Sequence, residues 1–138
     1  MADADVFDLE SEYVILDRES GARTTAGGAA FWDALMHGRL PEVEAGRLVT
    51  LGESTASWSS WEMHPEGEEV IVLLDGRVDF VLEQDGRERV VALERSGQCI
   101  VIPRGTWHTA RILVPARMLF ITAGAGTQHR PAEPSAPG

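Results

Sequence analysis

The chain has 138 residues, enough for one domain with its own core, and a formal net charge of −10, which disfavours nucleic-acid backbones and anionic membranes as partners. All of its positive residues are arginine, so no lysine serves Schiff-base chemistry. The single cysteine, Cys99, excludes an intrachain disulfide and is expected to be a small buried residue. The acidic start lacks the pattern of a secretory signal and no apolar run is long enough to span a bilayer, so we expect a cytoplasmic protein.

Residues 1–45 predict an N-terminal extension that packs on the main domain. A first strand is expected over residues 13–16, followed by a small, polar loop over residues 21–28. Residues 29–37 predict one short helix, which Gly38 ends. We expect this helix to lie against the sheet as a lid or brace.

From residue 46 to residue 123 the chain predicts strands separated by turns at short intervals. This pattern is typical of an antiparallel sandwich or barrel, an all-β fold. The expected strands cover residues 47–51, 55–64, 70–74, 78–82, 89–93, 99–102, 108–113 and 117–122, with turns at Asp75-Gly76, Asp85-Gly86 and Pro115. The tail over residues 124–138 is rich in glycine, alanine and proline and is predicted to be flexible, with disorder after Pro131.

Metal-binding residue types lie on or beside several of these strands. Glu62 and His64 are two apart on one predicted strand, so their side chains leave the same face roughly 6–7 Å apart. Glu69 borders an apolar run, where a buried carboxylate needs a cation or a donor. His108 follows a Pro-x-Gly turn in the second half of the chain. If the two halves pair face to face, all four side chains converge on one buried metal.

These residues stand in two spaced motifs, Glu62-x-His64-x4-Glu69-x6-Gly76 and Gly97-x5-Pro103-x-Gly105-x2-His108. Both are similar to the motifs of the cupin superfamily, and the chain resembles its small single-domain, cupin-2 type members. The chain departs from the family pattern where Glu62 replaces the leading histidine, where Ala56 replaces a glycine and where Ile112 replaces an asparagine.

The resemblance implies a double-stranded β-helix, or jelly-roll, over residues 46–123, which is commonly a homodimer. It also implies a bound divalent transition metal, and Mn, Fe, Ni or Zn suits ligands that include carboxylates. The implied metal ligands are Glu62, His64, Glu69 and His108, with Glu68 as the substitute for Glu69 if the turn is one residue shorter.

Glu62 has three possible roles. It is a fourth ligand, or a general base beside a three-ligand site of two histidines and one carboxylate, or a structural carboxylate. The cluster also has a metal-free interpretation, in which His64 and His108 form ion pairs with the acids.

Four further residues are candidates for a substrate pocket. Trp58 shares the inward face of Glu62 by strand alternation, and Phe80 and Phe120 are expected to line the barrel, although filling the core is their default role. Arg111 follows His108 by three residues and could hold a substrate carboxylate, with a solvated arginine as the alternative. His37 and His129 show no pattern that makes them site residues.

The function expected from these patterns is that of a metal-dependent enzyme acting on a small organic acid, enol or phenol-like molecule. Dioxygenation, isomerisation, cyclisation and lyase chemistry all remain open, because this fold supports each of them. The alternative is a non-catalytic cupin that binds or senses a small molecule. Turnover of a retained ligand distinguishes the two.

Overall fold

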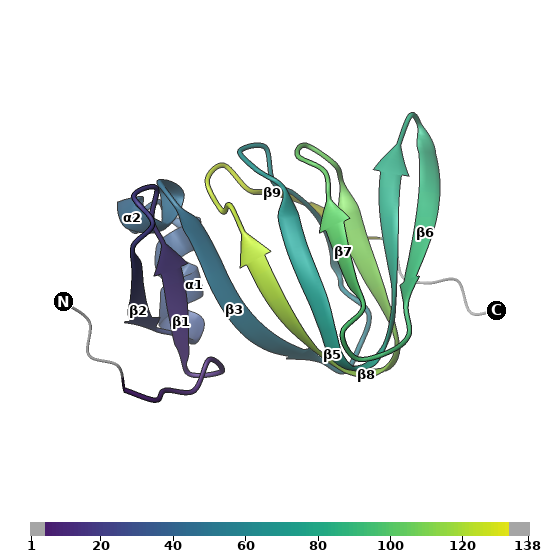
Figure 1. Cartoon of the computed structure of the whole chain (residues 1–138). Helices are drawn as coiled ribbons and strands as arrows, with labels where there is room; N and C mark the ends of the chain where they lie inside the picture. The colour runs from purple at the N-terminus through teal and green to yellow at the C-terminus, as the bar shows by residue number, and fades with distance from the viewer. Residues whose placement is uncertain (1–4, 133–138) are drawn as a thin grey trace.

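The computed structural model of the protein describes residues 5–132, so the predicted disorder of residues 133–138 lies outside the described part. Strands dominate it, as predicted from the sequence (Figure 1). In chain order the elements are β1 (Glu12–Leu16), β2 (Ala22–Ala26), α1 (Ala29–Met36), α2 (Pro41–Glu44), β3 (Arg47–Ser54), β4 (Ser60–Met63), β5 (Glu69–Gln84), β6 (Arg87–Leu93), β7 (Cys99–Ile102), β8 (His108–Thr122) and β9 (Gln128–Pro131). None of the described helices is both long enough and apolar enough to cross a bilayer.

The long antiparallel strands β5 and β8 form the spine of the sheet. One path of paired strands runs β2-β1-β3-β8-β4-β9, and β5 joins it by pairing with β8 while also pairing with β6 and β7. Figure 1 shows β3, β8, β5 and β7 side by side, and the long strands β5 and β8 curve at the bottom of the view. The all-β jelly-roll prediction is confirmed.

The curvature comes from an irregularity in the middle of both long strands. The β5–β8 register shifts between Leu73 and Val78, and shifts of this kind bend a strand and increase its twist. Gly76 adopts φ 93° there and lies so close to the backbone of Pro115 and Ala116 that a Cβ atom would collide with it. The predicted turns at Asp75-Gly76 and Pro115 are therefore wrong, because the two sites face each other as bends within continuous strands.

Two apolar clusters stabilise the fold. The larger one fills the barrel between the strands, with Phe80, Ile71 and Met118 all at 0% exposure. The smaller one joins the N-terminal residues to the barrel, since Phe31 of α1 and Tyr13 of β1 pack with Leu48 of β3. The strands between residues 12 and 26 thus extend the main sheet, and the helix α1 follows them.

Two segments predicted to lack regular structure are strands. The loop expected over residues 21–28 contains β2, which pairs with β1, and the tail expected to be flexible contains β9, which pairs with β4. Both strands are largely exposed and polar, so they lack the alternating apolar pattern that identifies a strand in a sequence.

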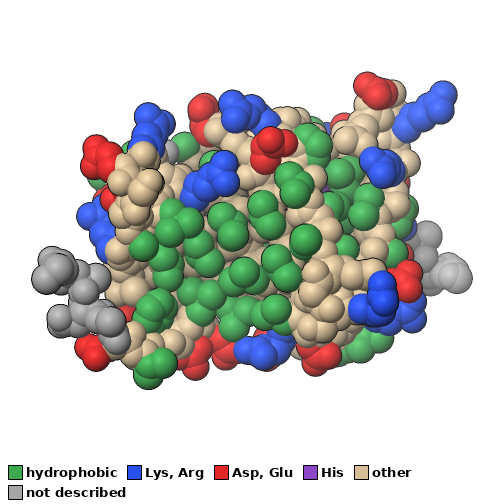
Figure 2. Space-filling model, in the orientation of Figure 1, with side chains coloured by type: hydrophobic (Ala, Val, Ile, Leu, Met, Phe, Trp, Pro, Cys, Tyr) green, Lys and Arg blue, Asp and Glu red, His purple; other side chains and the backbone are tan. Residues whose placement is uncertain are grey.

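The outer face of the β1-β3-β8-β5-β7 layer is apolar. Strand register aligns one row of aliphatic side chains across it, formed by Val14, Val49, Ile121, Val70 and Val101. Figure 2 shows hydrophobic side chains gathered over the centre of this face, with charged ones mostly at its margins. The expectation of a buried Cys99 is wrong, because Cys99 is exposed on β7, where burial alternates along the strand.

Candidate metal centre

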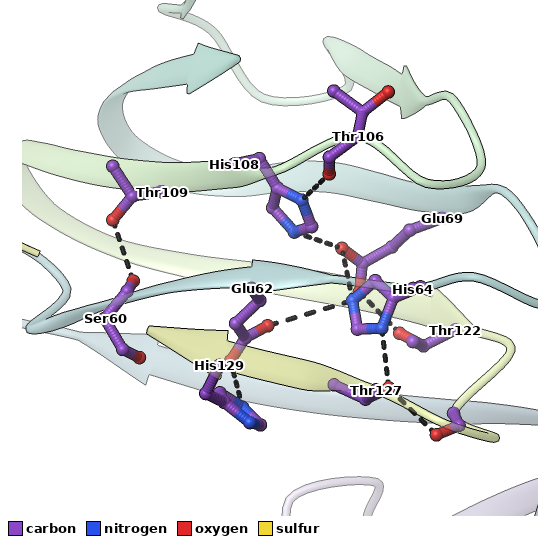
Figure 3. A network of polar contacts seen from close by, with 11 residues as sticks. Ser60, Glu62, His64, Glu69, Thr106, His108, Thr109, Thr122, Thr127 and His129 are labelled. Carbon is purple, nitrogen blue, oxygen red and sulfur yellow. Dashed lines mark hydrogen bonds and ion pairs between the residues drawn. The ribbon is translucent and has the colours of Figure 1, made fainter. Parts of the chain in front are cut away.

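Three strands place the four predicted ligands around one point (Figure 3). β4 carries Glu62 and ends one residue before His64, while Glu69 and His108 are the first residues of β5 and β8. Glu62 lies directly opposite His108 in the β4–β8 register. His64, Glu69 and His108 are buried, whereas 29% of the Glu62 side chain is exposed. The structure therefore brings together residues that are up to 46 positions apart, since they span positions 62 to 108.

The distances between their polar atoms suit one small cation. Glu69 Oε1 lies 3.1 Å from His108 Nε2 and 3.5 Å from His64 Nε2, and Glu62 Oε2 lies 3.8 Å from His64 Nε2. Glu62, His64 and His108 each also offer one ligand atom within 4.8 Å of the others, a group that does not include Glu69. Ligand atoms that each lie about 2.1 Å from one ion are roughly 3–3.5 Å apart. The contacts of Glu69 with the two histidines already have this spacing, whereas Glu62 at 3.8 Å from His64 is farther away.

The far side of the His108 ring fixes its protonation. His108 Nδ1 lies 3.0 Å from the carbonyl oxygen of Thr106, and because a carbonyl only accepts, Nδ1 carries the proton. In the neutral ring Nε2 is then left with a lone pair directed at the centre of the site. This is the usual arrangement of a metal-binding histidine.

The same argument applies to His64 through Thr127. The Thr127 hydroxyl donates its proton to the carbonyl oxygen of Gly124 at 2.8 Å. The contact of 2.8 Å between His64 Nδ1 and Thr127 Oγ1 must therefore be donated by His64. Nε2 of a neutral His64 again presents its lone pair to the site.

Glu69 is oriented in a corresponding way. The Thr122 hydroxyl donates to Glu69 Oε2 at 2.6 Å, which leaves Oε1 facing the two imidazoles. In the described part of the chain, His64 Nε2, Glu69 Oε1 and His108 Nε2 are buried without a hydrogen-bond partner. Buried polar atoms normally have partners, and three orphaned lone pairs converging on one point fit a divalent cation. The residues present therefore fit the metal that the resemblance implies.

Without a metal, a proton takes the place of the cation. Burial alone favours the neutral carboxyl, but hydrogen bonds and charges from His108 and His64 outweigh it and lower the pKa of Glu69 to about 2. Burial likewise opposes the charged imidazole, yet the hydrogen bond and negative charge of Glu69 raise the pKa of His108 above its ordinary value. The site is electrostatically built to hold positive charge.

A cavity of about 690 Å³ leads from this cluster toward α1. Glu62, His64 and Glu69 line its polar end. Apolar side chains from β1, α1, β3, β8 and the β3–β4 connection line much of the rest, namely Tyr13, Trp32, Leu35, Met36, Leu48, Leu51, Trp58 and Phe120. The helix expected to act as a lid does border this cavity.

The four predicted pocket residues have different positions. Trp58 and Phe120 line the cavity, with ring centroids 6.2 Å apart. Phe80 lies beneath Trp58 in an edge-on contact at 5.9 Å and is fully buried, so it supports the wall without lining it. Arg111 is exposed on β8 opposite Asp79 and is absent from the cavity lining, so its solvated alternative describes its position.

Sequence reasoning missed the residues that surround the ligands. His129, set aside as unrelated to the site, lines the cavity and places Nε2 3.4 Å from Glu62 Oε1. Thr122 and Thr127 orient Glu69 and His64 through their hydroxyls. No local pattern marks these residues, because each acquires its role only when β8 and β9 pair with their neighbours.

Several solved structures are similar to part of this chain. A cupin-2 domain containing protein from Shewanella frigidimarina shares 20% identity over 54% of this chain and 68% of its own, with a TM-score of 0.47. A cupin superfamily protein from Desulfitobacterium hafniense shares 17% over 55% and 65%, with a TM-score of 0.47. A hydroquinone 1,2-dioxygenase from Sphingomonas shares 17% over 62% and 60%, with a TM-score of 0.46.

At the level of sequence, a search of curated proteins finds no match. The family model for the cupin domain, however, matches residues 47–122, which is more than half of the chain. That range contains all four predicted ligands and both spaced motifs. The chain belongs to the cupin family.

Proposed function

We propose that the protein is a metal-dependent enzyme that holds one divalent transition metal, Mn, Fe, Ni or Zn, and acts on a small organic molecule. The observation that carries this proposal is the convergence of three buried, partnerless atoms, His64 Nε2, Glu69 Oε1 and His108 Nε2. A bound ion of this group supplies Lewis acidity and, if it is redox-active, a means of activating O2.

Glu62 is proposed as the fourth ligand. One of its carboxylate oxygens lies within 4.8 Å of a ring nitrogen of His64 and of His108, and Glu62 lines the cavity where a substrate would arrive. Its partial exposure also suits the alternative role of general base, because a base must reach both solvent and substrate. If Glu62 is a ligand its removal lowers metal affinity, whereas if it is a base its removal leaves metal affinity nearly unchanged.

The shape and lining of the cavity favour a substrate that is largely apolar at one end. Its volume lies within the range of about 300–1,000 Å³ found for small-molecule sites. Among the described residues that line it there is no arginine, and Glu62 and Glu69 place negative charge at its polar end. These features favour a phenol- or enol-type group directed at the metal, with its hydrocarbon part against Trp58 and Phe120, over a substrate held by a cationic side chain.

Within the site, the chain's own residues perform the positioning. Thr106, Thr122 and Thr127 hold the ligand side chains in one orientation before substrate arrives. Trp58 and Phe120 exclude water from the apolar end. Glu62 accepts or carries a proton beside the substrate if it is not a ligand.

The proposal is tested by metal analysis together with capture of a co-purified small molecule. The metal-reconstituted protein is expected to bind that molecule and convert it, with both properties lost in His108→Ala. Binding with no turnover under any of the four metals would reject the enzyme and favour the binding or sensing cupin. Loss of neither property in His108→Ala would reject the site.

We also propose a homodimer formed through the apolar outer face and located in the cytoplasm. The aligned row across β1, β3, β8, β5 and β7 would be shielded by the same row of a second copy, and an exposed thiol at Cys99 suits a reducing compartment. Val101→Arg should shift the protein to monomer in analytical ultracentrifugation. Val90→Arg is the matched control, because Val90 is 51% exposed against 56% for Val101 and lies outside the row. This variant should keep the mass of the wild-type protein. Equal masses for both variants and wild type would reject this interface.

A further inference from the structure

The C-terminal segment lies beyond the matched cupin domain and folds back onto the metal site. After a left-handed turn at Gly126, β9 pairs with all of β4 from Ser60 to Met63. On its other side β4 is paired with β8 only at Glu62 and His108. Without β9, the short strand that carries Glu62 would be an edge strand with most of its backbone groups unpaired. The segment therefore supports the strand that supplies the first ligand motif.

Two side chains of this segment contact predicted ligands directly (Figure 3). Thr127 Oγ1 accepts the proton of His64 Nδ1 at 2.8 Å, because its own proton is donated to Gly124. His129 lies opposite Glu62 in the β4–β9 register, and its Nε2 is 3.4 Å from Glu62 Oε1. Glu62 thus has one oxygen near His129 and the other, at 3.8 Å, near His64. Each contact restricts the orientation of a side chain at the metal site.

The opposite face of β9 carries its anchor. Arg130 follows His129, so its side chain leaves the other face of the strand. Its guanidinium lies over Trp61 at 5.0 Å and over Trp107 at 4.6 Å from the ring centroids, and it forms an ion pair with Glu83. Trp61 is on β4 and Trp107 directly precedes His108, so one arginine links β9 to both motif-bearing segments.

We propose that residues 124–131 form a strap that completes the metal site, with Thr127 and His129 as positioning residues and Arg130 as the anchor. This inference rests on the proposed metal-binding function. Thr127 keeps the His64 proton on Nδ1 and so leaves Nε2 free for the metal. His129 holds the Glu62 carboxylate at the mouth of the cavity. The cupin motifs alone therefore do not specify the complete site of this chain.

The first arm of the test removes the Thr127 hydroxyl. Thr127→Val keeps the shape of the side chain but cannot accept the His64 proton, so Zn²⁺ affinity measured by isothermal titration should fall roughly 10–100-fold. Thr127→Ser keeps the hydroxyl and should restore affinity. The visible absorption of Co²⁺, which reports ligand number and geometry, should change in Thr127→Val and return in Thr127→Ser. A His129→Ala variant should also bind Zn²⁺ more weakly than wild type.

The second arm loosens the anchor. Arg130→Ala should speed hydrogen exchange at the amides of β9 and β4 and weaken Zn²⁺ binding, because the competent arrangement is populated less. Arg117→Ala is the matched control, since Arg117 is also ion-paired and 43% exposed against 39% for Arg130, and it is absent from the cavity lining. It should leave both measurements at wild-type values.

The outcomes separate this inference from the proposed function. Suppose that wild-type protein binds Zn²⁺ and that Thr127→Val, His129→Ala and Arg130→Ala bind it equally well. This result would overturn the proposed strap but would not contradict the proposed metal site. Wild-type protein that binds no metal would overturn the proposed function and the strap with it. Weaker binding in the three variants, normal binding in Thr127→Ser and Arg117→Ala, and unchanged secondary structure would support the inference.

Discussion

Removal of the metal should lower the melting temperature of this protein by a predictable amount. In the metal-free site His64 Nε2, Glu69 Oε1 and His108 Nε2 lack hydrogen-bond partners, and an unsatisfied buried polar atom costs about 1–3 kcal/mol. Three such atoms together would cost about 3–9 kcal/mol. A proton on His108 shared with Glu69 relieves part of this cost, so we expect a loss at the lower end, about 3 kcal/mol. An unfolding entropy of about 2.1 cal/mol/K per residue gives roughly 0.3 kcal/mol/K for 138 residues. The melting temperature should therefore fall by about 10 °C.

The assay compares circular dichroism melts of metal-loaded protein with melts of the same protein after chelation and desalting. Reloading Zn²⁺ should restore the higher melting temperature, and the increment should grow with free metal concentration. The His108→Ala variant is the control, since it should melt at nearly the same temperature with and without metal. Superimposable melts of loaded and chelated wild-type protein would refute the reasoning that the three atoms require a cation.

Three other predictions concern individual side chains. If Glu62 is a ligand, Glu62→Gln should weaken metal binding and Glu62→His should shift metal preference toward softer ions. If Glu62 is a base, Glu62→Gln should keep the metal and lose roughly 10²–10⁴-fold in turnover. Metal titrations and activity assays on both variants decide between these roles. In the metal-free protein the pKa of Glu69 is lowered from 4.5 to about 2, so Glu69 stabilises the fold fully above pH 4.5 and loses this effect as the pH falls toward 2. The pKa of His108 is raised from 6.5, so His108 stabilises the fold fully below pH 6.5 and loses this effect as the pH rises through its pKa in the folded protein. Chelated protein should thus melt at its highest temperature between pH 4.5 and 6.5, and a melting temperature still rising well above that window would contradict the pairing. Arg111→Ala should leave substrate KM unchanged, because Arg111 is exposed outside the cavity.

The fold was predictable where the sequence carries a local pattern. The alternating or wholly apolar runs of β5, β7 and β8 and the spaced motifs around His64 and His108 indicated both the jelly roll and the convergence of the ligands. Such patterns arise because each strand must bury one face, and that requirement is written into successive residues.

The remainder depends on contacts between distant segments. β2 and β9 are held by strand pairing and carry few buried side chains, so their sequences resemble loops. The bends at Gly76 and Pro115 looked like turns because glycine and proline permit both, and only the pairing of β5 with β8 distinguishes them. The roles of Thr127 and His129 follow from the return of β9 to β4, which no local pattern in the tail indicates.

The central claim, one metal per chain on the convergent ligands, is tested most directly by elemental analysis after gel filtration. Wild-type protein and His37→Ala, whose histidine is exposed at the end of α1, should each carry roughly one divalent transition metal per chain after reconstitution with Mn, Fe, Ni and Zn. His64→Ala and His108→Ala should carry far less while keeping their β secondary structure, because the apolar clusters rather than the metal supply the core. Wild-type metal far below one per chain under all four conditions, or equal metal in all four proteins, would contradict the account.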